Sequence, residues 1–187
     1  MQDLQNAGSG LKKMFIASIG AVVCTVLLII PIVNILAMIG ALVFAIISLV
    51  GLNEAGKDIE GCKTAFLLTI VNMVVSVLKN IPFLGTGFLG ALFSIAGYIL
   101  GFLIVYYVCK SVADVLEQNE PDVAKTGHMV WKINLVCYAA EIIIAVLALI
   151  PLLNILAAFA SIIIAIVSLV ASILYMIFLY KSSNALA

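Results

Sequence analysis

Three long apolar runs dominate the pattern of hydrophobic and polar positions along the chain. The runs contain no charged residue and extend over residues 14–53, 80–109 and 142–180. About 20 helical residues cross a bilayer once, so the first run is long enough for two crossings. Pro31 lies near its middle and predicts a turn there, and Pro82 and Pro151 predict two further turns of the same kind. We therefore expect six membrane-spanning helices, over residues 13–30, 33–52, 64–80, 83–109, 129–150 and 152–180.

The predicted helices pair into three hairpins with related sequences. Pro31 and Asn34 of the first turn recur as Pro151 and Asn154 of the third, each time followed by Ile-Leu. Two spans in every repeat keep all copies in one orientation, which predicts parallel repeats about an axis normal to the membrane. The expected fold class is an all-α integral membrane protein, with three tandem parallel helical-hairpin repeats in a pseudo-threefold bundle. A single membrane domain, 1–187, is predicted to contain hairpin repeats at about 12–52, 63–109 and 129–180, joined by connectors 53–62 and 110–128.

The lysines predict how the chain is oriented. Eight of the nine lie on the side of the predicted spans that holds both termini and both connectors, and only Lys79 lies beside a hairpin turn. The positive-inside rule makes the lysine-rich side cytoplasmic. We expect a multi-pass protein of the cell membrane with its N- and C-termini in the cytoplasm. Connector 110–128 is expected to prolong the preceding helix, to break near Asn119 and Glu120, and to begin a new helix at Pro121.

Composition narrows the function classes. Hydrophobic residues make up 66% of the chain and charged residues 10%, whereas soluble proteins average about half and about a quarter. Arginine is absent and the formal net charge is zero, which excludes a basic face for nucleic acid. The four cysteines, Cys24, Cys62, Cys109 and Cys137, have no metal-binding spacing and are expected to pack as small apolar residues. No metal site and no cofactor are predicted, and membrane lipids are the expected surroundings.

A polar stripe on the first helix of each hairpin carries the candidate chemistry. With the turn prolines in register, Asn72 and Glu141 each lie ten residues before a proline. Offsets of three and four residues place further polar residues on the same helix faces. Such a stripe should turn away from lipid, toward the interior of the bundle. The predicted ligand or ion site contains Glu141, Asn72, Asn134, Tyr138, Thr69 and Ser76.

Glu141, near the expected bilayer midplane, has two interpretations. Burial disfavours a charged carboxyl, and the residue would then bind a proton, a cation or a small cationic solute in a transport or permeation module. Alternatively, Glu141 is protonated and joins helices by a hydrogen bond to Asn72 or a backbone carbonyl, in a non-catalytic scaffold for lipids or a partner. That alternative includes a homo-oligomer or a protein partner bound through the connectors. The sequence contains no recognisable nucleophile-and-base motif, so an enzyme is not expected.

A family resemblance offers a third interpretation. Six predicted spans in a chain of 19.8 kDa, with Ala17-x-x-x-Ala21 in the first span, resemble the substrate-binding subunits of energy-coupling-factor vitamin transporters. The resemblance implies that the chain is the substrate-binding subunit of a vitamin-uptake system. The three-hairpin repetition departs from the pattern expected of that family, and the resemblance identifies no binding residues.

Overall fold

Six helices make up almost all of the described chain. The computed structural model describes residues 4–27, 30, 33–83, 86–150 and 153–186. Each helix is long and apolar enough to cross a membrane, as the sequence predicts. Within the described residues there is no strand. The helices are α1 (Gln5–Leu27), α2 (Asn34–Ala55), α3 (Glu60–Lys79), α4 (Gly87–Leu116), α5 (Pro121–Leu147) and α6 (Asn154–Ala185).

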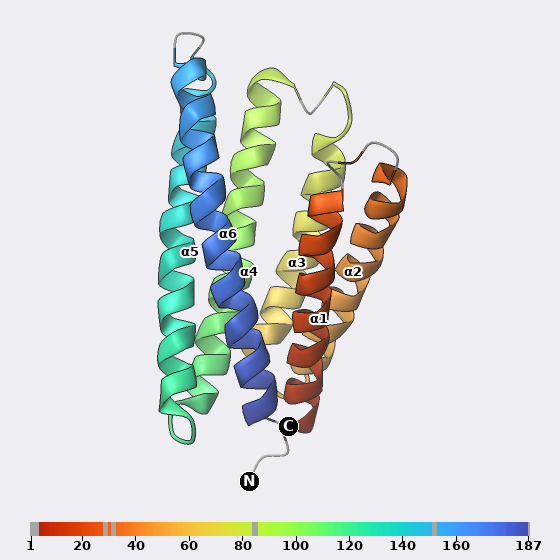
Figure 1. Cartoon of the computed structure of the whole chain (residues 1–187), viewed down its shortest axis with the longest axis vertical. Helices are drawn as coiled ribbons and strands as arrows, with labels where there is room; N and C mark the ends of the chain where they lie inside the picture. The colour runs from red at the N-terminus through yellow and green to blue at the C-terminus, as the bar shows by residue number, and fades with distance from the viewer. Residues whose placement is uncertain (1–3, 28–29, 31–32, 84–85, 151–152, 187) are drawn as a thin grey trace.

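The helices form a ring in chain order (Figure 1). Each helix packs on its neighbours in the sequence, α6 returns to contact α1, and α4 also touches α6. At one end, which we call the terminal end, α1 begins and α6 finishes, beside the bends 56–59 and 117–120. At the opposite, hairpin end α1, α3 and α5 finish and α2, α4 and α6 begin. Pro31 and Pro151, which predict two of the turns there, lie outside the described residues.

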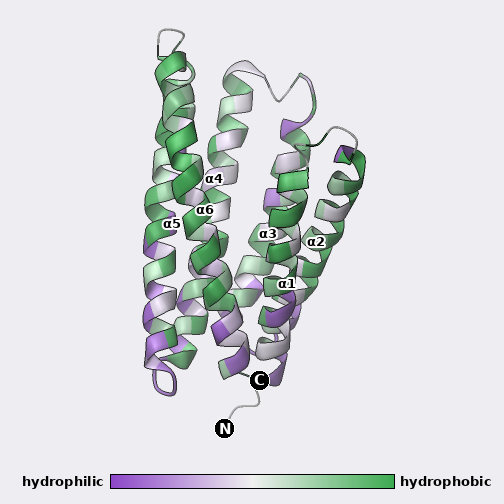
Figure 2. Cartoon of the chain, in the orientation of Figure 1, coloured by the Kyte–Doolittle hydropathy of each residue, from purple (hydrophilic) through white to green (hydrophobic). Residues whose placement is uncertain are grey.

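The buried apolar core lies at the terminal end. All six helices contribute to it, with side chains such as Leu11, Leu52, Val112 and Phe178. Many large apolar side chains elsewhere are exposed, and Leu36 near the hairpin end is 70% exposed. Figure 2 shows apolar residues along the outer lengths of the helices and hydrophilic residues gathered toward the terminal end. An apolar surface of this extent matches the requirements of a hydrocarbon environment rather than those of water.

Close approaches between helices at the terminal end require glycine. A Cβ atom on Gly10 of α1 would lie 2.5 Å from the carbonyl oxygen of Gly51 and 2.6 Å from the amide nitrogen of Ala55, both on α2. A Cβ atom on Gly61 of α3 would meet the Ser111 side chain of α4 at 2.5 Å, and one on Gly127 of α5 would meet the Phe178 ring of α6 at 2.6 Å. Small residues at such crossings allow helix backbones to approach closely. Each hairpin is therefore closed by a glycine on its first helix, a feature compatible with the predicted repeats.

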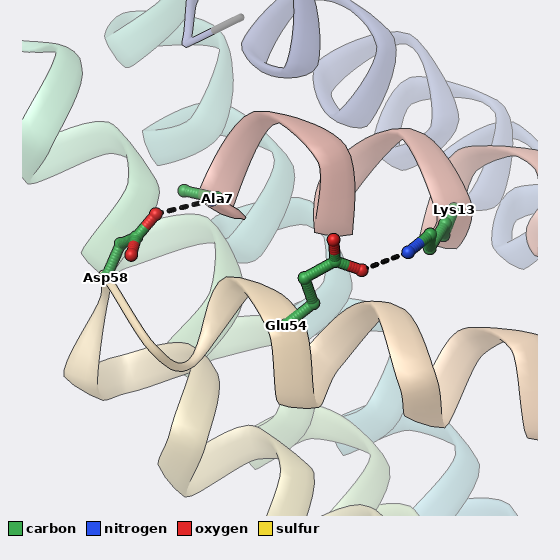
Figure 3. Close-up of polar contacts among 4 residues, drawn as sticks. All are labelled: Ala7, Lys13, Glu54 and Asp58. Atoms are coloured by element: carbon green, nitrogen blue, oxygen red, sulfur yellow. Dashed lines mark hydrogen bonds and ion pairs between the residues drawn. The ribbon is translucent and has the colours of Figure 1, made fainter. Parts of the chain in front are cut away.

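Polar contacts fasten the start of α1 to the bend between α2 and α3 (Figure 3). The Asp58 carboxylate accepts hydrogen bonds from the backbone N–H of Ala7, at 2.7 Å, and from the Asn6 side chain, at 3.1 Å. A carboxylate at a helix N-terminus satisfies otherwise free N–H groups and interacts favourably with the helix dipole. Further along α1, Lys13 forms an ion pair with Glu54 of α2. The bend thus caps a helix that is distant from it in the sequence.

Substitution of Asp58 by alanine should destabilise the first turn of α1. Loss of the capping carboxylate leaves the Ala7 N–H without its partner, and such a loss costs about 1 kcal/mol. We expect amide hydrogen exchange at residues 5–8 to become about fivefold faster, while exchange in α5 is unchanged. Lys57→Ala, which removes an exposed side chain from the same bend, is the matched control. Unchanged protection of the first turn in Asp58→Ala would contradict the capping role.

The predicted helix break in connector 110–128 is confirmed. α4 ends at Leu116 and α5 begins at Pro121, so only residues 117–120 lie outside a helix. Pro121 occupies the first turn of α5, where the N–H that proline lacks would have no partner in the helix. Val112 and Ala124, on the two sides of the break, are both buried in the terminal core. The helical extensions beyond the predicted spans are therefore part of the packed bundle.

Candidate functional site

Glu141 of α5 lines a cavity between α4, α5 and α6. The cavity has a volume of about 560 Å³, and it is formed by the beginning of α4, the end of α5 and the beginning of α6. It therefore lies toward the hairpin end, away from the terminal core. Glu141 is the one charged residue among the described residues that line it. The lining residues are Gly87, Ala91, Ser94, Tyr98, Glu141, Ile144, Ala145, Ala148, Leu149, Ser161, Ile164 and Ala165.

The Glu141 carboxyl group forms one hydrogen bond to a neighbouring helix. The hydroxyl of Ser168 on α6 donates to Glu141 Oε1 at 3.2 Å. A carboxylate offers about four acceptor positions on its two oxygens, so this bond leaves most of them available. The ion pairs within the described part of the chain join Lys13 to Glu54 and Lys125 to Asp122, and neither involves Glu141. Glu141 is half-buried and retains capacity for a further partner.

The polar groups around Glu141 favour a ligand that donates hydrogen bonds. The hydroxyls of Ser94 and Ser161 donate to the carbonyls of Gly90 and Ala157 in their own helices, at 2.9 and 2.7 Å. Each hydroxyl proton is thereby used, and each oxygen remains an acceptor. No basic residue lines this cavity among those that the structure describes. The arrangement therefore suits a cation that carries N–H groups or a diffuse positive charge, set against apolar walls.

A smaller cavity of about 200 Å³ lies between α3 and α4. Asn72 and Ser76 of α3 line it, and Ser94 and Tyr98 of α4 line both cavities. The Asn72 Oδ1 atom is buried and has no hydrogen-bond partner among the described residues. The structure therefore brings Asn72 and Glu141 to two cavities that share a wall. Among the described residues, the hydrogen bond of Glu141 goes to Ser168 of α6, and none joins Glu141 to Asn72.

Three other predicted site residues lie outside both cavities. The Thr69 hydroxyl and the Asn134 amide each donate to the carbonyl four residues earlier in their own helix, at 2.8 and 2.9 Å. Tyr138 packs edge-on against Phe102 of α4, with 6.4 Å between the ring centroids. On α1 the polar stripe fails to turn inward, because Thr25 is exposed and donates to its own helix. A polar side chain at helical spacing is often satisfied locally, which weakens the stripe as a guide to a site.

Four polar residues near Glu141 were not among the sequence candidates, and two of them are Ser94 and Ser161, which line the cavity. Tyr98 of α4 also lines the cavity, and Ser168 of α6 bonds to Glu141. All four belong to the second helix of a hairpin, whereas the predicted stripe considers only the first helices. Their hydroxyl groups within apolar runs are the sequence signal that points to them, because a polar group in a membrane helix needs a partner.

The four cysteines behave as expected from the sequence. Cys24, Cys62, Cys109 and Cys137 are all buried and none is in a disulfide. Cys62 and Cys109 belong to the terminal core, where each acts as a small apolar side chain. The chain matches no protein family model, no curated protein and no solved structure.

Proposed function

We propose that the chain is a multi-pass membrane protein that binds a small organic cation beside Glu141, as a transport or permeation module. One observation carries the proposal, which is an acid in a cavity of about 560 Å³ with no basic residue among its described lining. A carboxyl group in apolar surroundings is stabilised as the carboxylate when a cation neutralises it. The oxygens of Ser94 and Ser161 add acceptors for N–H groups. Apolar walls suit the hydrocarbon part of the same ligand.

Insertion in a membrane is the first part of the proposal. Six helices of sufficient length and an outward apolar surface support it. The lysine-rich terminal end would then face the cytoplasm of the cell, according to the positive-inside rule. Within a bilayer an acidic side chain is costly, at roughly 2.5 to 3.5 kcal/mol on insertion scales, and faces the bundle interior or a water-filled cavity. The location of Glu141 at a cavity agrees with that requirement.

Substitution of Glu141 by glutamine should remove cation binding. Methylammonium is the probe, because its N–H groups can donate to the carboxylate and the serine oxygens, and its binding to the protein in lipid nanodiscs is measured by isothermal titration calorimetry. We expect the affinity to fall at least about tenfold, because glutamine preserves the shape but not the charge. Glu117→Gln removes an exposed acid that lies outside the cavity and should leave binding unchanged. Equal affinity in Glu141→Gln and the native protein would disprove the proposed site.

Transport itself needs a second measurement. Proteoliposomes containing the native protein should take up labelled methylammonium, and those containing Glu141→Gln should not. Binding of methylammonium without any uptake of it would assign a binding role to the cavity and contradict the transport role. A circular dichroism spectrum equal to that of the native protein serves as the folding control for the variant.

A scaffold is the second candidate function, and the Ser168–Glu141 hydrogen bond favours it by joining α5 to α6. Such a bond between membrane helices contributes about 0.6 kcal/mol. In this case Ser168→Ala lowers stability by that amount, Glu141→Gln has a smaller effect because glutamine keeps an oxygen that accepts the bond, and the native protein binds no methylammonium. The exposed acids Asp114, Glu117 and Glu120 would supply a surface for a partner protein or a second copy of the chain.

A further inference from the structure

The outward face of α5 has a groove that is separate from the Glu141 cavity. Its volume is about 570 Å³, and side chains from three successive turns of α5 line it. We propose that this groove binds an anionic phospholipid, with the phosphate at its basic end and an acyl chain along its apolar end. The site depends on the proposed membrane insertion but not on cation binding by Glu141. The lining residues are Lys125, His128, Met129, Lys132, Ile133 and Val136.

The basic end of the groove offers hydrogen-bond donors. Lys125 and Lys132 have exposed ammonium groups that lie two turns apart on the same helix face. The Trp131 Nε1–H group donates to His128 Nδ1 at 3.4 Å, so the second nitrogen of a neutral His128 carries a proton and is a donor. No acid lines the groove among the described residues. Three donors in a lining that contains no acid match the acceptor oxygens of a phosphate group.

Neither lysine is held by a strong partner. The Lys125 Nζ atom lies 3.4 Å from Asp122 Oδ1, but both side chains are largely exposed, at 78% and 93%. An ion pair so exposed contributes little, and a phosphate can replace the carboxylate. The Lys132 Nζ atom lies 5.7 Å from the centre of the Trp131 ring, which keeps the ammonium beside the groove. Both cations are therefore available to an anionic ligand.

The apolar end of the groove identifies a lipid rather than a soluble anion. Met129, Ile133 and Val136 continue the face occupied by the basic residues, and Val136 is 67% exposed. Lys125 and His128 lie nearest the terminal end of α5, Lys132 follows between Met129 and Ile133, and Ile133 and Val136 lie toward the hairpin end. A phospholipid in the cytoplasmic leaflet has the same order, with its phosphate at the surface and its acyl chain in the hydrocarbon. Free phosphate would leave the apolar half of the groove unused.

Native mass spectrometry in detergent, with equal amounts of palmitoyl-oleoyl phosphatidylglycerol and phosphatidylcholine, tests this site. We expect the native protein to retain phosphatidylglycerol preferentially. Lys125→Gln/Lys132→Gln should reduce the retained phosphatidylglycerol about tenfold, because basic residues near the surface dominate attraction to anionic lipids. Lys12→Gln/Lys57→Gln is the matched control, since it removes two exposed lysines of the terminal end on other elements. The control should retain as much phosphatidylglycerol as the native protein.

Three results would overturn the proposal. One is equal retention of the two lipids by the native protein. Another is an equal loss of phosphatidylglycerol in the two double variants, which would indicate attraction to total charge and not to the groove. The third is displacement of phosphatidylglycerol by an equal concentration of glycerol 3-phosphate, which would assign the groove to soluble phosphates. All four lysines are exposed, and unchanged melting temperatures of the variants establish that they fold.

Discussion

Replacing Phe178 with alanine should lower the free energy of unfolding by about 3 to 5 kcal/mol. Phe178 of α6 has no exposed surface and packs in the terminal core against Gly127 of α5. Alanine removes the ring and leaves a space that backbone movement cannot fill without separating α5 from α6. The measurement is equilibrium unfolding in dodecyl maltoside micelles, followed by circular dichroism. Native helix content before the transition shows that the variant has folded.

Phe159→Ala is the matched control for this prediction. Phe159 lies on the same helix near the hairpin end and is 66% exposed, so its ring contacts mainly detergent or lipid. Its removal should change the free energy of unfolding by less than about 0.5 kcal/mol. Equal losses in the two variants would mean that the terminal core does not dominate stability.

Replacing Gly10 with alanine should destabilise the α1–α2 hairpin by about 1 to 3 kcal/mol. The added Cβ atom would meet the backbone of Gly51 and Ala55 at 2.5 and 2.6 Å, well inside van der Waals contact. Backbone atoms of a helix cannot rotate away as a side chain can, so α1 must move away from α2. That movement also pulls Lys13 away from Glu54. A lower midpoint of unfolding in micelles is the expected result.

Gly97→Ala makes the same chemical change at a site that has room for a Cβ atom, and we expect the opposite effect on stability. A Cβ atom on Gly97 of α4 would have Asn72 Oδ1 as its nearest neighbour, at the ordinary contact distance of 3.7 Å. Alanine also favours a helix over glycine, by up to about 1 kcal/mol. The variant should therefore be as stable as the native protein or more stable. If both substitutions change stability in the same direction, helix propensity and not close packing controls these sites.

The sequence predicts the number of helices and, within two residues, the starts of α2, α5 and α6, but it misses the start of α1 by eight residues. The runs without charged residues predict the apolar part of each span, and Pro121 predicts where α5 begins. That helix begins eight residues before the predicted span at 129, because residues 121–128 are polar on one side and bury Ala124 and Gly127 on the other. Because residues 121–128 include charged side chains, they lie outside every long charge-free run of the sequence. Likewise, the sequence does not predict that Asp58 caps α1, since this contact depends on how α1 and α2 cross.

The candidate site was only partly predictable for a related reason. The sequence predicts how deep Glu141 lies within its span, because this depth depends only on the distance of the residue from the two ends of the span. Its neighbours depend on how each helix is rotated about its own axis, which the packing of whole helices determines. Ser168 therefore replaces Asn72 as its partner, and Tyr98 enters the cavity from a helix that the polar stripe omits. Asn134 has the predicted polarity but is satisfied within its own helix.

α4 and α6 are longer than the hydrocarbon layer of a membrane is thick, so the two ends of the molecule would lie in different solvents. Their 30 and 32 residues correspond to roughly 45 and 48 Å, against a hydrocarbon thickness of about 30 Å. In a bilayer the surplus projects beyond the acyl chains at the terminal end, and that is where the buried core lies. Lipid tails are as apolar as leucine and give helices no hydrophobic reason to associate, whereas water does. Water at the membrane surface would then hold the six helices together, and the lipid-embedded hairpins would have freedom to separate around a solute.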